Sequence, residues 1–180
     1  MKIGIDISQM AYEGTGVANY LRRLVEGLVA LDKDNQYVLF YSSMRKNRPH
    51  PDPLLKGEGV KGRVSIKQFK MPPSVLDILW NRLHVLPIES LIGDVDLFIT
   101  SDWTEPPTRR AKKATILYDL IIYKFPDETD KKIIATQKRK LKWVKEESDI
   151  IFCISESTKK DAMEILGIEE SRLKVIHAGV

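Results

Sequence analysis

Lys2-Ile3-Gly4-Ile5-Asp6-Ile7 opens the chain as an almost continuous apolar run. Such a run is typical of a short strand that is buried on both faces. From Gly16 to Leu31 the apolar residues recur at helical spacing, which predicts a helix with one apolar face. A buried strand followed by an amphipathic helix is the repeating unit of a parallel sheet, so the opening residues already favour an α/β fold.

The rest of the chain repeats this alternation. Further apolar runs predict strands at 37–41, 63–69, 96–99, 115–118, 149–154 and 173–176. Helices are expected at 74–85, 129–147 and 156–166, with Ser74 and Ser155 as N-caps and Gly167 after the last helix. The predicted fold class is therefore α/β, a doubly wound and mostly parallel sheet with helices on both faces.

Length and composition agree with one globular domain spanning residues 1–180. The chain is 43% hydrophobic and 30% charged, which excludes a disordered or fibrous protein. Its single cysteine, Cys153, lies in an apolar run, where it is expected to be a small buried side chain. No apolar stretch has the length of a transmembrane helix, and Asp6 interrupts any signal-peptide pattern, so a cytoplasmic location is expected.

The net charge of +4 comes from the first half of the chain. Residues 44–70 hold eight basic side chains against Asp52 and Glu58. This segment is either a solvated loop and strand, or a basic lip that attracts phosphate groups, anionic lipid or an acidic acceptor. Nucleic-acid binding is not expected, because the basic residues do not alternate with aromatic ones and no recognition motif is present.

Ligands of open parallel sheets bind beyond the carboxyl ends of the strands, so residues at these ends are candidate site residues. Gly14-Thr15-Gly16 opens the first helix, where free N–H groups can face a phosphate or sugar oxygen, although the glycines could simply turn the chain. Tyr118-Asp119 follows the fifth strand, and Asp119 could orient a hydroxyl or cap the next segment. Ser155 follows the sixth strand, where a plain N-cap role explains it.

The usual catalytic constellations are missing from the sequence. His50, His84 and His177 do not have the spacing of metal ligands, and neither a nucleophile elbow nor a Walker loop is present. A dinucleotide fingerprint is also incomplete, because Asn19 stands where the third glycine would be. This argues against a dinucleotide-dependent oxidoreductase.

Taken in order, these segments resemble the N-terminal domain of family 4 glycosyltransferases, in particular the mannosyltransferase-like branch. The resemblance covers essentially the whole chain and is carried by the glycine loop at 14–20, Asp96-Leu97-Phe98-Ile99, Tyr118-Asp119-Leu120 and the stretch from Ser148 to Asp161. It implies a retaining enzyme of the GT-B type, with two Rossmann-like domains, that moves a sugar from a nucleotide-sugar to a glycan or lipid-linked acceptor. The family usually needs no metal or other cofactor.

The resemblance also assigns roles to residues. It implies that the N-terminal domain binds the acceptor and that Gly14, Thr15 and Gly16 approach the donor phosphates. It also implies that Asn19, Tyr118, Asp119 and Ser155 belong to the substrate-binding residues. The family commonly has His at the position of Tyr118. A tyrosine hydroxyl still donates and accepts hydrogen bonds, but it does not titrate near neutrality.

The donor-nucleotide domain of the family is not within these 180 residues. The chain is therefore expected to be the acceptor half of the enzyme, inactive alone and peripheral to the inner face of the membrane if its acceptor is lipid-linked. The alternative is a stand-alone module that binds a glycan or nucleotide without catalysis.

Overall fold

A computed structural model describes residues 1–44 and 62–177. Its centre is one seven-stranded sheet in the order β3-β2-β1-β4-β5-β6-β7, with every pair of neighbouring strands parallel. The strands are β1 (Lys2–Asp6), β2 (Gln36–Ser42), β3 (Val64–Phe69), β4 (Leu97–Thr100), β5 (Lys112–Leu117), β6 (Ile150–Cys153) and β7 (Leu173–Val175). The chain builds outward from β1 in one direction and then in the other, which confirms the doubly wound α/β fold.

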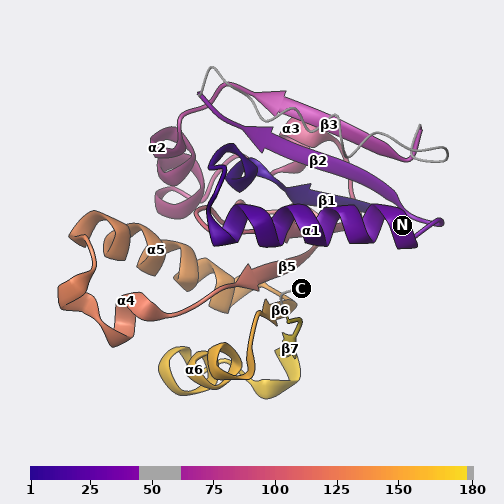
Figure 1. Ribbon diagram of the computed structural model, residues 1–180. Coiled ribbons are helices and arrows are strands. Elements are labelled where there is room, and N and C mark those ends of the chain that lie inside the picture. Colours follow the sequence, from indigo (N-terminus) through magenta and orange to yellow (C-terminus); the bar gives the residue numbers. More distant parts are fainter. Residues whose placement is uncertain (45–61, 178–180) are drawn as a thin grey trace.

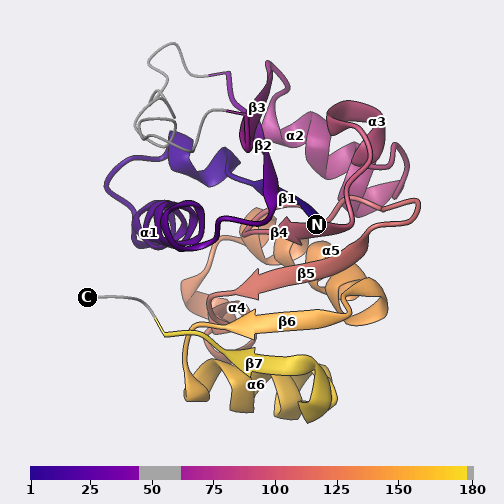
Figure 2. The ribbon, with the colours of Figure 1, turned by 90° about the vertical axis from the view of Figure 1, so that its right-hand side faces the viewer.

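Helices cover both faces of the sheet. The longer ones are α1 (Gly16–Leu31), α5 (Lys131–Glu147) and α6 (Glu156–Leu166), and the short ones are α2 (Pro73–Leu76), α3 (Glu89–Ile92) and α4 (Ile121–Lys124). Single turns of 3-10 helix are η1 (Ser8–Ala11), η4 (Pro126–Glu128) and η5 (Glu170–Arg172). Figure 1 shows α1 lying along the sheet, and in Figure 2 α1 lies on one side of the sheet with α2 and α3 on the other.

Three apolar cores fill the space between the layers. One joins α1 to β1, β2 and β5 through residues such as Leu21, Leu39 and Ile116. On the opposite face, a core around Trp80 and Phe98 lies under α2 and α3, and a core around Leu141 and Ile151 lies under α5 and α6. The alternation of side chains along each strand sends neighbouring residues into different cores, as the two-faced burial of a parallel sheet requires.

The expected helix over 74–85 differs most from the structure. The N-cap is Pro72 and not Ser74, and after α2 the backbone widens into a π-helical segment, η3 (Asp77–Arg82). His84 and Leu86 then have positive φ angles of 52° and 65°. Hydrogen bonds to groups outside η3 hold this geometry: the indole N–H of Trp80 donates to the carbonyl of Leu86, and Asn81 donates to the carbonyl of Trp103. Within η3, Asn81 also donates to Asp77.

The helix expected at 129–147 forms as α5, but its buried face does not consist of apolar side chains alone. Leu141 and Val144 are buried, whereas Ile133 is exposed and Lys140 is buried. Trp143 is half-buried against η3, and its indole N–H donates to the carbonyl of Asn81 at 2.9 Å. The amphipathic pattern therefore predicts the position of the helix better than the identity of every inward side chain.

A buried polar cluster separates the two cores on the second face. The carboxylate of Glu105 is fully buried and lies 3.1 Å from Nζ of Lys113, whose side chain is 3% exposed. The hydroxyls of Thr100 and Thr115 also donate to Glu105. An ionised side chain away from water is tolerated only when it is paired and hydrogen-bonded, and this cluster meets both conditions.

The cluster continues outward to the surface of α5. Nζ of Lys113 also donates to Glu147, and Glu147 accepts a hydrogen bond from Nε2 of His84 at 2.7 Å. Although burial works against ionisation, the bonds from Lys113 and His84 lower the pKa of Glu147. The ring of His84 stacks on Trp143 with 3.6 Å between centroids, so this cluster fixes α5 against the segment after η3.

Removing the buried cation should therefore cost far more stability than removing its exposed neighbour. Lys113→Met keeps the apolar stem but leaves Glu105 without its ion-pair partner, and we expect the free energy of unfolding to fall by about 3–5 kcal/mol. Lys112→Met is the matched control, because Lys112 pairs with Asp149 at the surface with side chains 74% and 42% exposed, where ion pairs contribute little. Urea denaturation of both variants measures the difference, and equal losses would contradict the role given to the cluster.

Candidate functional site

A large cavity lies where the sheet reverses direction. It has a volume of about 500 Å³ and sits at the carboxyl ends of β1, β2 and β4. We call it the main cavity. Its walls combine two carboxyl groups, Asp6 and Asp102, with hydroxyl groups such as Ser8 and Thr15, and with apolar surface from Trp103 and other residues. Open α/β sheets bind ligands at this position, and the volume is in the range of small-molecule sites.

Thr15 brings the predicted glycine loop to this cavity. It is the N-cap of α1: its hydroxyl accepts from the N–H of Ala18 at 3.2 Å and donates to the carbonyl of Tyr12 at 2.9 Å. Gly14 has a φ of 82°, a conformation that side chains rarely adopt, and a Cβ at Gly14 or Gly16 would meet open space. Gly14 therefore shapes the turn, and the absence of side chains at both glycines leaves the start of α1 open.

The two carboxyl groups in the wall of the main cavity, Asp6 and Asp102, lie near a buried lysine, Lys140. Asp6 ends β1 and accepts a hydrogen bond from the N–H of Ser8, while Asp102 follows β4 and accepts from the side-chain amide of Gln137. Lys140 reaches across from α5 and donates to the carbonyl of Ser101 at 2.6 Å. Because all three are removed from water, burial raises the pKa of Asp6 and of Asp102 and lowers the pKa of Lys140.

A smaller cavity of about 200 Å³ adjoins the main one and is called here the Tyr118 cavity. Tyr118 and Asp119 line it, and it shares Asp102 and Trp103 with the main cavity. The hydroxyl of Tyr118 lies 3.1 Å from that of Ser101, and its ring meets Tyr20 edge-on at 5.6 Å. Burial raises the pKa of Tyr118, so this side chain stays neutral and acts only through hydrogen bonds and packing.

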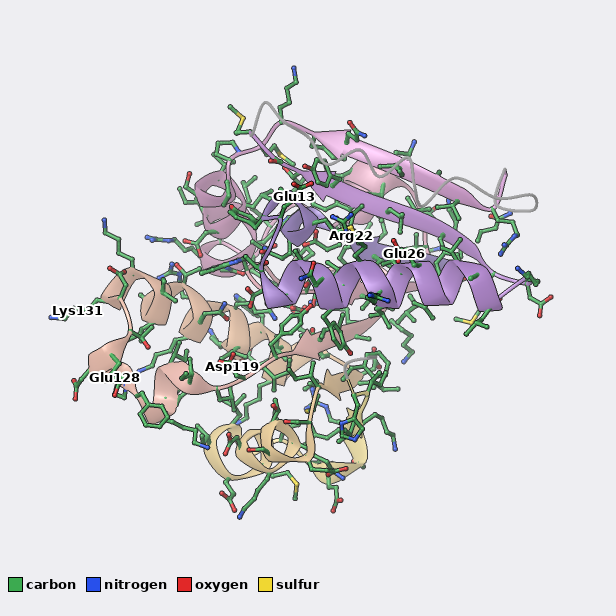
Figure 3. The ribbon with its side chains drawn as sticks, viewed as in Figure 1. Glu13, Arg22, Glu26, Asp119, Glu128 and Lys131 are labelled. Carbon is green, nitrogen blue, oxygen red and sulfur yellow. The ribbon has the colours of Figure 1, made fainter. Side chains whose placement is uncertain are left out.

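Asp119 and Ser155 have structural roles in the same region. Asp119 is exposed just after β5 (Figure 3), and its carboxylate accepts from the N–H of Ile121, so it caps the next segment, which is one of its two predicted roles. Ser155 is the N-cap of α6 and accepts from the N–H of Thr158 at 3.1 Å. The hydroxyl of Thr158 in turn donates to the carbonyl of Tyr118 at 3.0 Å, so Ser155 supports the Tyr118 cavity through α6.

The structure thus brings some predicted residues together and leaves others apart. Thr15 lines the main cavity, and Tyr118 and Asp119 line the Tyr118 cavity. Of the remaining predicted residues, Gly14, Gly16, Asn19 and Ser155, none lines either cavity, and Asn19 is exposed on α1. Most of the basic segment at 44–70, predicted to be either a solvated loop and strand or a basic lip, lies outside the described residues.

Sequence reasoning missed Asp6, Asp102, Trp103 and Lys140. The first three end or follow strands β1 and β4, so the position rule that pointed to Tyr118 also applies to them. Lys140 carries no such signal, because it is one of many lysines in α5. Within the part of the chain that the structure describes, no group of three or more His, Cys, Asp or Glu side chains could hold a metal ion.

The sequence matches a known protein family. The family model described as Glycosyltransferase Family 4 matches residues 14–180, which is nearly the whole chain and includes the glycine loop, Tyr118 and α6. The chain belongs to glycosyltransferase family 4. Membership supports a role in glycosyl transfer, and the family 4 match runs through every strand of the sheet except β1.

Two further comparisons add little. No curated protein matches the sequence. Among solved structures, a short-chain dehydrogenase from Oenococcus oeni PSU-1 is similar over 99% of this chain and 96% of its own, with a TM-score of 0.39 and 11% sequence identity. A likeness this low carries no argument, so the description of the fold rests on the strand order itself.

The burial of Asp6 makes the stability of the folded chain depend on pH in a way that can be measured. The raised pKa of Asp6 means that the folded chain binds its proton more tightly than the unfolded chain, so stability falls as pH rises above the ordinary value of 3.8. Asp6→Asn keeps a side-chain oxygen for Ser8 but cannot ionise. Relative to the wild type, its free energy of unfolding should therefore increase between about pH 4 and about pH 7.

Asp77→Asn is the control with the opposite sign. Burial opposes ionisation there too, but hydrogen bonds from Asn81, Arg139 and Arg82 lower the pKa of Asp77. The free energy of unfolding of the wild type should therefore rise relative to that of Asp77→Asn as the pH rises. Denaturant titrations at several pH values measure the free energy of unfolding of both variants and the wild type. If this free energy depends on pH in the same way for Asp6→Asn and the wild type, the prediction for Asp6 is refuted.

Proposed function

We propose that the chain is the acceptor-binding half of a retaining glycosyltransferase, one that moves a hexose such as mannose from a nucleotide-sugar to a glycan or lipid-linked acceptor. The main cavity is the acceptor site in this proposal. The single observation that carries it is the main cavity itself, a preformed space of about 500 Å³ at the reversal point of the sheet in a family 4 chain.

The composition of the main cavity supports a sugar ligand. Sugars present many hydroxyl groups on a ring that also has apolar faces. Carboxyl groups such as Asp6 and Asp102 accept hydrogen bonds from ligand hydroxyls, and Thr15 and Ser8 can exchange bonds with them. Trp103 is half-buried and offers a flat apolar surface on which a sugar ring can pack.

In this proposal the nucleotide-sugar donor binds across the reaction centre from the acceptor in the main cavity. In the proposal, a second domain of the family architecture holds most of the nucleotide, and the start of α1 with Gly14 and Gly16 faces the donor phosphates. The N–H groups at this helix start carry partial positive charge and lie next to Thr15 in the main cavity wall. Tyr118, neutral and buried, contributes shape and a hydroxyl to the pocket for the transferred sugar.

Trp103→Ala tests the acceptor site. Titration of the ¹⁵N-labelled chain with mannobiose should shift the indole N–H resonance of Trp103, and the alanine variant should bind about tenfold more weakly, the upper end of ring-packing energies. Trp143→Phe is the matched control, since Trp143 packs on His84 and lines neither the main cavity nor the Tyr118 cavity. An unchanged affinity in Trp103→Ala would remove the main support for the proposal.

A transfer assay separates the enzyme from a non-catalytic module. The product of the complete reading frame that contains this sequence is incubated with radiolabelled nucleotide-sugars and the best-binding acceptor. Transfer with retained anomeric configuration supports the proposal, whereas binding without transfer for every donor favours a glycan- or nucleotide-binding module. The 180-residue chain alone is expected to bind acceptor without transferring sugar.

We also propose that the chain contacts a membrane surface at the cytoplasmic side. Ile78, Leu83 and Val85 are 46%, 61% and 47% exposed around η3, and the neighbouring α5 displays exposed lysines. Apolar side chains beside cations fit the interface of an anionic bilayer. Within the described residues, none of the helices has the length and apolar character needed to cross a membrane.

Vesicle co-sedimentation at low salt tests this contact. Binding should be stronger to phosphatidylcholine vesicles containing phosphatidylglycerol than to phosphatidylcholine alone, because each basic residue near an anionic surface contributes about 1 kcal/mol. Leu83→Glu should weaken binding, whereas Leu31→Glu, at an 85% exposed position at the end of α1, should not. Equal binding to both vesicle types would exclude an electrostatic contact.

A further inference from the structure

A third cavity, of about 480 Å³, continues from the main cavity on the far side of Trp103. It lies between α2, η3 and α5, and it shares Pro73, Trp103 and Thr104 with the main cavity. Because Arg82 and Arg139 line it, we call it the arginine cavity. In Figure 1, α2 and α5 are neighbours at the same end of the molecule, and the side chains of η3 and α5 are joined by hydrogen bonds.

The charge of the arginine cavity is predominantly positive. Arg82, Lys132 and Arg139 line it against a single carboxylate, Asp77. Asp77 accepts from Nη2 of Arg139 at 2.8 Å and from Nε of Arg82 at 3.1 Å. One carboxylate therefore holds two guanidinium groups in place on the cavity wall but neutralises only one of the three positive charges.

The two guanidinium groups keep N–H donors that have no partner among residues 1–44 and 62–177. Arg139 spends Nη2 on Asp77 and Thr136, while its Nε is buried and has no acceptor among the described residues. A buried N–H without a partner is uncommon and calls for a ligand or water. Arg82 uses only Nε and leaves the rest of a side chain that is 56% exposed facing outward.

We propose that the arginine cavity is a subsite for an anionic group of the acceptor, bound by Arg139 and Arg82. This inference rests on the proposed function, since it takes the main cavity as the acceptor site. An acceptor whose neutral sugar packs on Trp103 would place its next unit past Thr104, where Arg82 can bind a phosphate or a carboxylate through its two Nη groups and Arg139 adds a second positive charge. The acceptor class is thus a phosphorylated or uronic-acid-containing glycan.

Three small probes test the subsite on the ¹⁵N-labelled chain: methyl glucoside, methyl glucuronide and glucose 6-phosphate. At low salt, we expect at least one of the two charged probes to bind about tenfold more tightly than the neutral one, with the preference falling as salt is added. A preference for glucose 6-phosphate alone assigns the site to phosphate, and a similar preference for both charged probes assigns it to anions in general. Equal affinity for charged and neutral probes would overturn the inference.

Variants identify the residues. Arg139→Gln should lower the affinity for the preferred charged probe by about fivefold and leave methyl glucoside unchanged, because only the charged bond is lost. Asp77→Asn should raise the affinity for that charged probe, since it frees both arginines from an internal carboxylate; a purely structural role predicts no gain. Lys131→Gln is the matched control, because Lys131 lies at the start of the same helix but outside the lining of the arginine cavity (Figure 3).

The outcomes distinguish this inference from the proposed function. If no probe shifts the Trp103 indole resonance, the acceptor site itself is wrong, and the subsite falls with it. If all three probes shift Trp103 equally and Arg139→Gln has no effect, the acceptor site stands and only the anion subsite is refuted. Circular dichroism of each variant confirms that a lost signal is not lost folding.

Discussion

The buried ion pair between Glu105 and Lys113 is the constraint around which the functional end of the sheet is arranged. Two charges away from water need every nearby donor and acceptor in place, so β4, β5 and α5 must meet in one register. The loop that carries Glu105 is held by this requirement, and Trp103, two residues earlier, is held with it. The main cavity and the arginine cavity both use Trp103 as a wall, so an ion pair that lines neither cavity shapes both.

Much of the fold could be read from local patterns. The helix expected from Gly16 begins and ends at the residues of α1, and Ser155 and Gly167 cap α6 as predicted, because N-caps and left-handed C-caps depend on residues close in sequence. The widening of η3 could not be predicted in this way. It depends on Asn81 and Trp80 bonding to Trp103 and Leu86, contacts that exist only after the chain has folded.

The residues of the candidate site could likewise be predicted from the sequence only in part. Thr15, Tyr118 and Asp119 follow from the rule that ligands bind beyond the carboxyl ends of parallel strands, and the same rule applies to Asp6 and Asp102. Lys140 could not be predicted, because nothing in the sequence distinguishes a buried lysine of this lysine-rich helix from its solvent-exposed neighbours. Burial of Lys140 depends on the carbonyl of Ser101 and on the carboxyl groups around it, which come from three different strands and loops. Charge clusters of this kind are tertiary properties.

The stack of His84 on Trp143 has an evolutionary consequence. His84 also bonds Glu147, Trp143 bonds the backbone of Asn81, and Glu147 completes the ion pair of Lys113. Replacing any one of His84, Trp143 and Glu147 would leave the other two with unmatched surfaces or charges. Among homologues these three positions should therefore vary together or not at all, whereas the neighbouring lysines of α5 are free to drift independently.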